Sequence, residues 1–275
     1  MTLRLTKDTQ LCMSLAARPS NIGTRFHNFL YEELGLDFVY KAFALTDATQ
    51  LAAAIGGIRA LGVRGCAVSM PFKEAVIPMV DVLDASAGRL QSINTIVNEG
   101  GRLLAYNTDY IAVRQLLGRH PVQPGLKVAL RGSGGMARAV LAALVDGGLV
   151  DGTVVSRNAV AGRALAAAHG WCWQSDAEDI EADWLVNVTP IGMAGGADAG
   201  TLAFSPAQIE AADRVFDVVA LPARTPLIRE AERQGKPVIT GAEVIALQAA
   251  AQFTLYTGVT LTDDQIARAS QFSRQ

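Results

Sequence analysis

A glycine-rich segment in the second half of the chain has the residue types and spacing of a phosphate-binding turn. An apolar, strand-like run, Val128-Ala129-Leu130-Arg131, precedes it, and a segment with helical periodicity follows. Between them, Gly132, Gly134 and Ala137 satisfy the pattern G-x-G-x-x-[G/A]. Glycine permits a tight turn and close approach of the backbone, and the N–H groups that begin a helix attract anions. The pattern predicts a turn that binds a dinucleotide pyrophosphate; the alternative is an ordinary glycine-rich β–α turn.

The end of the next predicted strand distinguishes between the two nicotinamide dinucleotides. A site for NAD usually has an acidic residue about 20 positions past the first glycine, where it binds a ribose hydroxyl. The chain has Ser156-Arg157-Asn158 in that neighbourhood, with no acid at the strand end. The planar guanidinium of Arg157 suits a 2′-phosphate, so we predict NADP as the cofactor. The alternative is that Arg157 is a solvated surface charge.

Hydride transfer to or from an alcohol also needs a group that takes or gives the hydroxyl proton. Two segments of the first half contain candidates: residues 68–74 include Lys73, and residues 105–109 include Asp109. An ammonium beside a carboxylate can hold a substrate hydroxyl and relay its proton. By residue type alone, both side chains would be placed at the surface.

These segments, taken with others, resemble the shikimate dehydrogenase family. Ser69-Met70-Pro71-Phe72-Lys73 is similar to the family motif T-V-P-[FHY]-K, and Asn107-Thr108-Asp109 to its N-T-D. Residues 92–95 are similar to A-V-N-T, 132–135 to G-A-G-G, 187–193 to N-A-T-x-x-G-M, and 241–248 to a late substrate-binding helix. The matches run in order over nearly the whole chain.

The resemblance implies a two-domain NADP enzyme with its active site in the cleft between the domains. Lys73 would be the general acid/base, and Asp109 would orient it and bind a neighbouring hydroxyl. The implied reaction is reversible hydride transfer between shikimate and 3-dehydroshikimate, a step of aromatic amino acid biosynthesis through chorismate. The expected substrate-binding residues are Asn21, Ser69, Asn94 and Gln248. The expected cofactor-binding residues are Gly132, Ser133, Gly134, Gly135, Met136, Ala137, Ser156, Arg157, Asn158, Thr189 and Gly241.

The chain departs from the family where the family binds the substrate carboxylate. The family pattern S-x-S-P-x-x-H-N, whose serines hold that carboxylate, reads Asn21-Ile22-Gly23-Thr24-Arg25-Phe26-His27-Asn28 here. A family tyrosine that also contacts the carboxylate is replaced by Ala220. The second basic residue of the cofactor motif falls on Ala161, with Arg163 nearby. These departures resemble a divergent, shikimate dehydrogenase-like subgroup.

The departures leave open what the chain binds. Ser20, Asn21 and Thr24 are candidate replacement donors for the carboxylate. One alternative is that quinate or another polyol carboxylate is the substrate. A second, of another class, is a sensor or partner protein that binds NADP and has vestigial activity.

Strand and helix signals alternate along the chain and would position these residues. In the first third we predict strands at 11–15, 38–43 and 65–70, helices at 24–34 and 47–61, and a hairpin of 93–97 with 103–105. A helix at 109–117 leads to a hinge at 118–125. A second series follows, with strands at 127–131, 153–156, 184–188 and 215–219 and helices at 135–145, 162–169 and 244–256.

This alternation predicts an α/β protein with mainly parallel sheets. We expect an N-terminal α/β substrate domain, residues 1–108 plus 240–275, and a Rossmann-type NADP-binding domain, residues 109–239. A chain of 275 residues is long enough for both.

The composition and charge of the chain limit the kinds of partner that the protein is expected to bind. The formal net charge is −2, without a basic stripe, which argues against nucleic acid. Three dispersed cysteines, Cys12, Cys66 and Cys172, predict neither a disulfide framework nor a metal site. Residues 1–8 lack the apolar core of a signal peptide, and no apolar run reaches membrane-spanning length, so we expect a cytoplasmic protein without a membrane partner. The expected assembly is a monomer or homodimer that binds a small polyol carboxylate.

Overall fold

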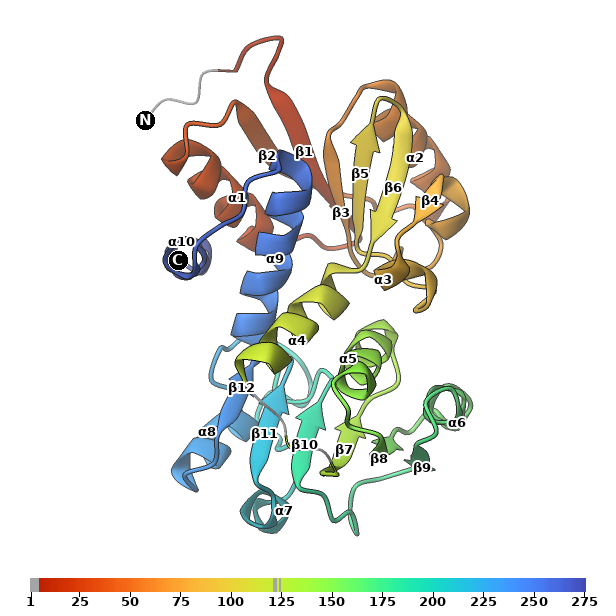
Figure 1. The fold of residues 1–275 in the computed structure, drawn as a ribbon, viewed down its shortest axis with the longest axis vertical. Helices are drawn as coiled ribbons and strands as arrows, with labels where there is room; N and C mark the ends of the chain where they lie inside the picture. Colours follow the sequence, from red (N-terminus) through yellow and green to blue (C-terminus); the bar gives the residue numbers. More distant parts are fainter. Residues whose placement is uncertain (1–4, 121–122, 124) are drawn as a thin grey trace. The chain divides into compact units, whose positions relative to one another are not determined.

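The computed structural model describes residues 5–120, 123 and 125–275, and these form two compact units (Figure 1). One unit contains the described chain up to Thr108 together with Ala246–Gln275, and the other contains Asp109–Ile245. The chain leaves the first unit at the start of helix α4 (Thr108–Arg119) and returns within α9 (Gly241–Thr257). Some residues of two predicted segments lie outside the described residues. These are residues 1–4 of the start that was predicted to lack a signal peptide, and residues 121, 122 and 124 of the predicted hinge.

The first unit is built on a six-stranded sheet with the order β2-β1-β3-β5-β6-β4. Strand β1 pairs in parallel with β2 and β3, whereas β5 runs antiparallel to both β3 and β6. The strands are β1 (Gln10–Ala16), β2 (Phe38–Ala44), β3 (Gly65–Val68), β4 (Val82–Leu83), β5 (Thr95–Glu99) and β6 (Arg102–Tyr106). The helices are α1 (Ile22–Glu33), α2 (Leu51–Ala60), α3 (Ala85–Gly88) and α10 (Asp263–Ser273), with 3₁₀ turns at Ala48–Gln50 and Ile77–Met79. The predicted helix 47–61 is therefore shorter at its start, where Asp47 caps the 3₁₀ turn.

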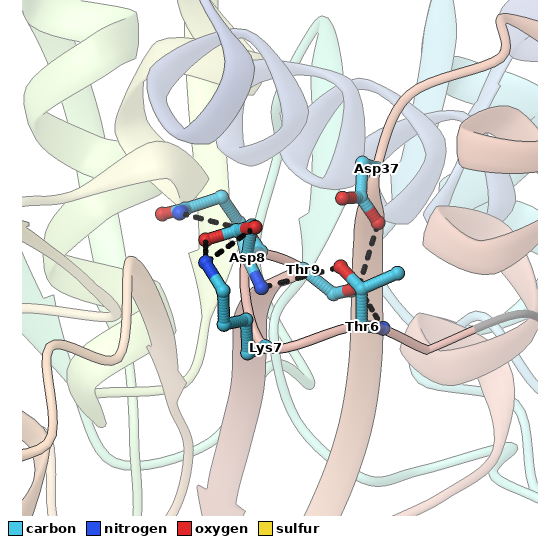
Figure 2. Close-up of polar contacts among 6 residues, drawn as sticks. Thr6, Lys7, Asp8, Thr9 and Asp37 are labelled. Carbon is cyan, nitrogen blue, oxygen red and sulfur yellow. Dashed lines mark hydrogen bonds and ion pairs between the residues drawn. The ribbon is translucent and has the colours of Figure 1, made fainter.

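Side chains at the start of the first sheet tie β1 to the segment that precedes β2 (Figure 2). The hydroxyl of Thr9 donates to Asp37 Oδ1 at 2.7 Å, and the Gln10 N–H donates to the Asp37 carbonyl at 3.0 Å. Thr9 Oγ1 also accepts from the backbone N–H of Thr6 at 2.9 Å. These bonds fix the register in which β1 and β2 pair, and that register sets which face of the sheet each side chain occupies.

Buried aromatic rings stand on one face of this sheet. His27 of α1 stacks on Tyr40 of β2 with the ring centroids 4.5 Å apart and also lies against Phe253 of α9. Cys66 is fully buried on β3. Arg64 donates to the carbonyls of Tyr256 and Leu255, so it caps the end of α9.

The second unit contains an all-parallel sheet with the order β12-β11-β10-β7-β8-β9. Counted from β7, this is the strand order 3-2-1-4-5-6 of dinucleotide-binding Rossmann folds. The strands are β7 (Lys127–Arg131), β8 (Asp151–Val155), β9 (Cys172–Gln174), β10 (Trp184–Asn187), β11 (Arg214–Asp217) and β12 (Val238–Thr240). The helices are α5 (Gly135–Asp146), α6 (Ala159–Ala167), α7 (Pro206–Ala211) and α8 (Pro226–Arg233). The predicted α/β class with a Rossmann-type fold is confirmed.

The strand order reverses between β7 and β10, and ligands of such sheets bind at the carboxyl ends beside this point. Within the described part of the chain, no helix has the length and hydropathy needed to cross a membrane.

Candidate cofactor and substrate sites

The first glycine of the turn lies directly at the strand-order reversal. Gly132 has φ +130°, a conformation that side chains rarely adopt. A Cβ there would lie 2.7 Å from Val188 Cγ2 and 2.9 Å from the Val188 carbonyl oxygen, just past the end of β10. The Gly132 N–H donates to the Val155 carbonyl of β8 at 2.8 Å. The ends of β7, β8 and β10 therefore meet at a position that requires glycine.

The second glycine of the turn faces open space. Gly134 is the N-cap of α5, and no atom of the described residues lies within 4 Å of the position that its Cβ would occupy. The first turn of α5 has no acidic residue, and no side chain caps its N–H groups. Ala137 is fully buried, whereas Ser133, Gly135 and Met136 are half-buried. This arrangement fits a pyrophosphate, because an anion can approach the uncapped helix N-terminus without meeting a side chain.

The three residues after β8 differ in what their side chains do. Ser156 is buried; its hydroxyl donates to the Asn158 carbonyl at 3.1 Å and accepts from Trp173 Nε1 at 3.2 Å. Asn158 caps α6 by accepting from the Ala161 N–H at 3.1 Å. Arg157, between them, is exposed and forms no ion pair within the described part of the chain. Ser156 and Asn158 shape the turn, and Arg157 presents a guanidinium at the carboxyl edge of the sheet.

A buried hydrogen-bond network joins the ends of β10 and β11. Thr189 donates its hydroxyl to Asn187 Oδ1 at 2.6 Å, and Asn187 Nδ2 donates to Asp217 Oδ1 at 3.0 Å. Asp217 also accepts the hydroxyl of Thr225, the N-cap of α8, at 2.6 Å. Burial raises the pKa of the Asp217 carboxyl to about 6 although hydrogen bonds act in the opposite direction. The network fixes the loop that carries Thr189.

The remaining predicted cofactor residue, Gly241, begins α9. A Cβ there would lie 2.2 Å from the Val218 carbonyl oxygen, so close backbone packing requires glycine at this position. Close packing explains the glycine at this position, and the contact of Gly241 with the cofactor stays a prediction.

In the first unit, Asn94 joins the two motifs that carry the candidate substrate residues. Its Oδ1 accepts from the Thr108 N–H at 2.7 Å, from the Thr108 hydroxyl at 2.9 Å and from the Thr95 hydroxyl at 2.9 Å. Asn94 is 2% exposed, and its Nδ2 is buried without a hydrogen-bond partner among the residues that the structure describes. A buried unpaired amide N–H is costly, so it points to a ligand oxygen that accepts from it.

The other candidate substrate and catalytic residues lie near the chain segments that Asn94 connects. Ser69 is exposed after β3, and Lys73 is half-buried in the turn that follows, where its carbonyl accepts from the Ile93 N–H at 2.9 Å. Gln248 Nε2 donates to the Thr108 hydroxyl at 3.4 Å, a long bond. Asp109, in the first turn of α4, is 8% exposed. The pairing of Lys73 with Asp109 stays a prediction.

The N-terminus of α1 shows what the changed family pattern does. Asn21 is exposed at the N-cap position, but its side chain does not cap the helix. A Cβ on Gly23 would lie 3.4 Å from the Tyr40 hydroxyl, and Thr24 Oγ1 is buried without a hydrogen-bond partner. Asn28 bonds both the N–H and the carbonyl of Tyr40 at 2.8 Å. The retained His-Asn end therefore holds α1 on β2, while the changed end remains available to a ligand.

Sequence reasoning missed Arg131, Gln252 and Asp217. Gln252 Nε2 donates to the Thr95 hydroxyl at 3.0 Å and so supports the strand that follows Asn94. Arg131 is the last residue of β7 and donates from Nη1 to the Ala203 carbonyl. A charge that closes an otherwise apolar strand is the signal that could have drawn attention to Arg131.

Comparisons with known proteins agree with this architecture and these motifs. Residues 21–96 match the family described as "Shikimate dehydrogenase substrate binding domain". A "Shikimate dehydrogenase (NADP(+))" of Citrifermentans bemidjiense is 37% identical over 249 residues, which cover 84% of each chain. The chain belongs to the shikimate dehydrogenase family.

Within the family, the chain is strongly similar to a divergent member. A "Shikimate dehydrogenase-like protein" of Haemophilus influenzae is 52% identical over 270 residues, 98% of each chain. The solved structure of shikimate 5-dehydrogenase from Thermus thermophilus, in complex with NADP(H) and shikimate, has a TM-score of 0.85 and 27% identity. That match covers 96% of this chain and 99% of the other. The suspected resemblance to the family and to its shikimate dehydrogenase-like subgroup is confirmed.

Proposed function

We propose that the protein is an NADP-dependent dehydrogenase that interconverts shikimate, or a closely similar cyclic polyol carboxylate, with its keto form. The observation that carries the proposal is the glycine turn, with Gly134 open to solvent at an uncapped helix N-terminus. Relatives in the family are named for NADP(+) and shikimate, which supports the same cofactor and substrate class here.

The residues of the second unit would hold the cofactor, which supplies the hydride acceptor when it is bound. The N–H groups at the start of α5 would bind the pyrophosphate, and Arg157 would bind the 2′-phosphate. The loop fixed by Asn187 and Asp217 would carry Thr189 to its cofactor contact.

Residues of the first unit, with Asp109 at the start of the second, would bind and deprotonate the substrate. Asn94 Nδ2 would donate to a substrate oxygen and so gain the partner that it lacks. Lys73 would take the proton of the hydroxyl that is oxidised, and Asp109 would orient Lys73 and bind an adjacent hydroxyl. Proton transfer of this kind contributes about 10²- to 10⁴-fold to a rate.

The test is NADPH formation from NADP⁺ and shikimate, followed for the wild type and Lys73→Ala. We expect Lys73→Ala to lower kcat by about 10²-fold or more while NADP⁺ affinity is retained. Lys7→Ala is the matched control, because Lys7 is 88% exposed and pairs with Asp8 at the surface. Unchanged turnover in Lys73→Ala would exclude the catalytic role of that lysine.

A second candidate substrate is quinate or another polyol carboxylate, favoured by the geometry at the start of α1. Neither Asn21 nor Gly23 offers the hydroxyl that the family uses, and loss of a charged hydrogen bond costs about 1.5–3 kcal/mol. A panel of polyol acids compared by kcat/KM separates the candidates. Clear preference for shikimate would exclude the alternative, whereas NADP binding without oxidation of any polyol acid would favour a sensor or partner protein.

A further inference from the structure

A second arginine stands beside Arg157 at the carboxyl edge of the parallel sheet. Strands β7 and β8 pair in parallel with Arg131 opposite Val155, and Arg157 follows two residues later. The bond from the Gly132 N–H to the Val155 carbonyl keeps the two strand ends together beyond Arg131. Arg131 therefore lies between the glycine turn and the turn that presents Arg157.

The surroundings of Arg131 leave most of its guanidinium donors without a protein acceptor. Its Nη1 donates to the Ala203 carbonyl, and it forms no ion pair within the described residues. Desolvation lowers the pKa of Arg131, and the positive charge of Arg157 lowers it further, whereas the carboxylates of Asp198 and Asp176 act in the opposite direction. The positive charge of Arg157 therefore acts on the Arg131 guanidinium, and neither aspartate forms an ion pair with Arg131 within the described residues.

Two positively charged side chains placed in this way are better stabilised with a bound dianion than in the free protein. A phosphate that accepts hydrogen bonds from two arginines replaces their mutual repulsion with two charge-assisted contacts. The aspartates would offset the repulsion until the anion binds, since they act on the same guanidinium from farther away.

We propose that Arg131 acts with Arg157 to bind the 2′-phosphate of the cofactor's adenosine half, and that this pair sets the preference for NADP over NAD. The inference rests on the proposed function. It assigns the second basic residue of the 2′-phosphate site to Arg131, at the end of the strand before the glycine turn. Arg163, the basic residue nearest to Ala161 in sequence, stacks on Trp173 instead, with its guanidinium carbon 4.5 Å from the ring centroid.

The test uses binding of 2′,5′-ADP (adenosine 2′,5′-bisphosphate) and 5′-AMP to the full chain by isothermal titration calorimetry. These probes differ in the 2′-phosphate alone, and their binding does not depend on catalysis. We expect the wild type to prefer 2′,5′-ADP and Arg131→Met to lose about 10- to 100-fold of that affinity, with 5′-AMP affinity unchanged. Arg131→Lys should lose less, because it keeps the charge without the fork.

Arg163→Met is the matched control, and we expect it to leave the preference for 2′,5′-ADP intact. Unchanged 5′-AMP binding shows that Arg131→Met keeps its fold. If Arg157→Met loses the preference while Arg131→Met and Arg131→Lys retain it fully, the role of Arg131 is refuted and the NADP assignment stands. If the wild type itself does not distinguish the two probes, the NADP assignment and the role of Arg131 both fail.

Discussion

Replacement of His27 by phenylalanine should remove an acid-sensitive contribution to the stability of the first unit. His27 is fully buried, and in the described part of the chain neither ring nitrogen has a hydrogen-bond partner. Desolvation lowers its pKa from 6.5 to about 3, so the folded protein keeps the ring neutral. Phenylalanine preserves the stacking on Tyr40 and has no group to protonate.

The sign and size of the effect follow from proton linkage. Between the folded and unfolded pKa values the unfolded chain binds a proton that the folded chain does not, so this stability is complete above 6.5 and is lost as the pH falls. At pH 5 the loss is about 2 kcal/mol, since each pH unit below the unfolded pKa contributes about 1.4 kcal/mol. His27→Phe should therefore be less destabilised than the wild type by about 2 kcal/mol when the pH is lowered from 7 to 5.

The assay must report on the first unit specifically. All three tryptophans, Trp171, Trp173 and Trp184, lie in the second unit, so tryptophan fluorescence would follow the wrong part of the chain. Amide hydrogen exchange of peptides from β1 and β2, compared at pH 7 and pH 5 after correction for intrinsic exchange, gives the opening free energy of the relevant sheet. His169→Gln, in the second unit, serves as the control. Equal acid sensitivity of His27→Phe and the wild type would refute the linkage argument.

Four further substitutions test the second unit and the substrate site. Gly134→Ala should keep the melting temperature but weaken NADP binding by about tenfold or more, because its methyl group enters the space open to the pyrophosphate. Gly132→Ala should instead lower the free energy of unfolding by more than about 1 kcal/mol, because its methyl group would meet Val188. Equal melting temperatures for the two variants would contradict this difference. Asn94→Asp should raise KM for the polyol acid more than it changes NADP affinity, since it removes the unpaired Nδ2 donor; an unchanged KM would exclude that contact. Because the folded pKa of Asp217 is raised, the wild type should lose about 3 kcal/mol of stability as the pH rises from 3.8 towards 6. Asp217→Asn should abolish this loss. Parallel pH profiles of urea unfolding for the variant and the wild type would refute the prediction.

Local patterns were enough to predict the elements that carry the candidate residues. The strand before the glycine turn was predicted at 127–131, and β7 spans Lys127–Arg131. Short elements such as β4, β9 and α7 were not predicted, because a few residues carry too little periodicity to be distinguished from loop. The order of the motifs along the chain also identified the family, because each motif consists of consecutive residues.

The sequence by itself determined the glycine-rich turn, the α/β alternation and the family, because each depends on residues that are close together in the chain. Only the tertiary structure decided that Gly132 must fit against Val188, that Asn94 holds Thr108 and keeps a spare donor, and that Arg131 pairs across the sheet with Val155, two residues before Arg157. These contacts depend on strand order and register in the two sheets. Side-chain pairs that the sheets bring together leave no spacing rule in the sequence, because the intervening chain can have almost any length.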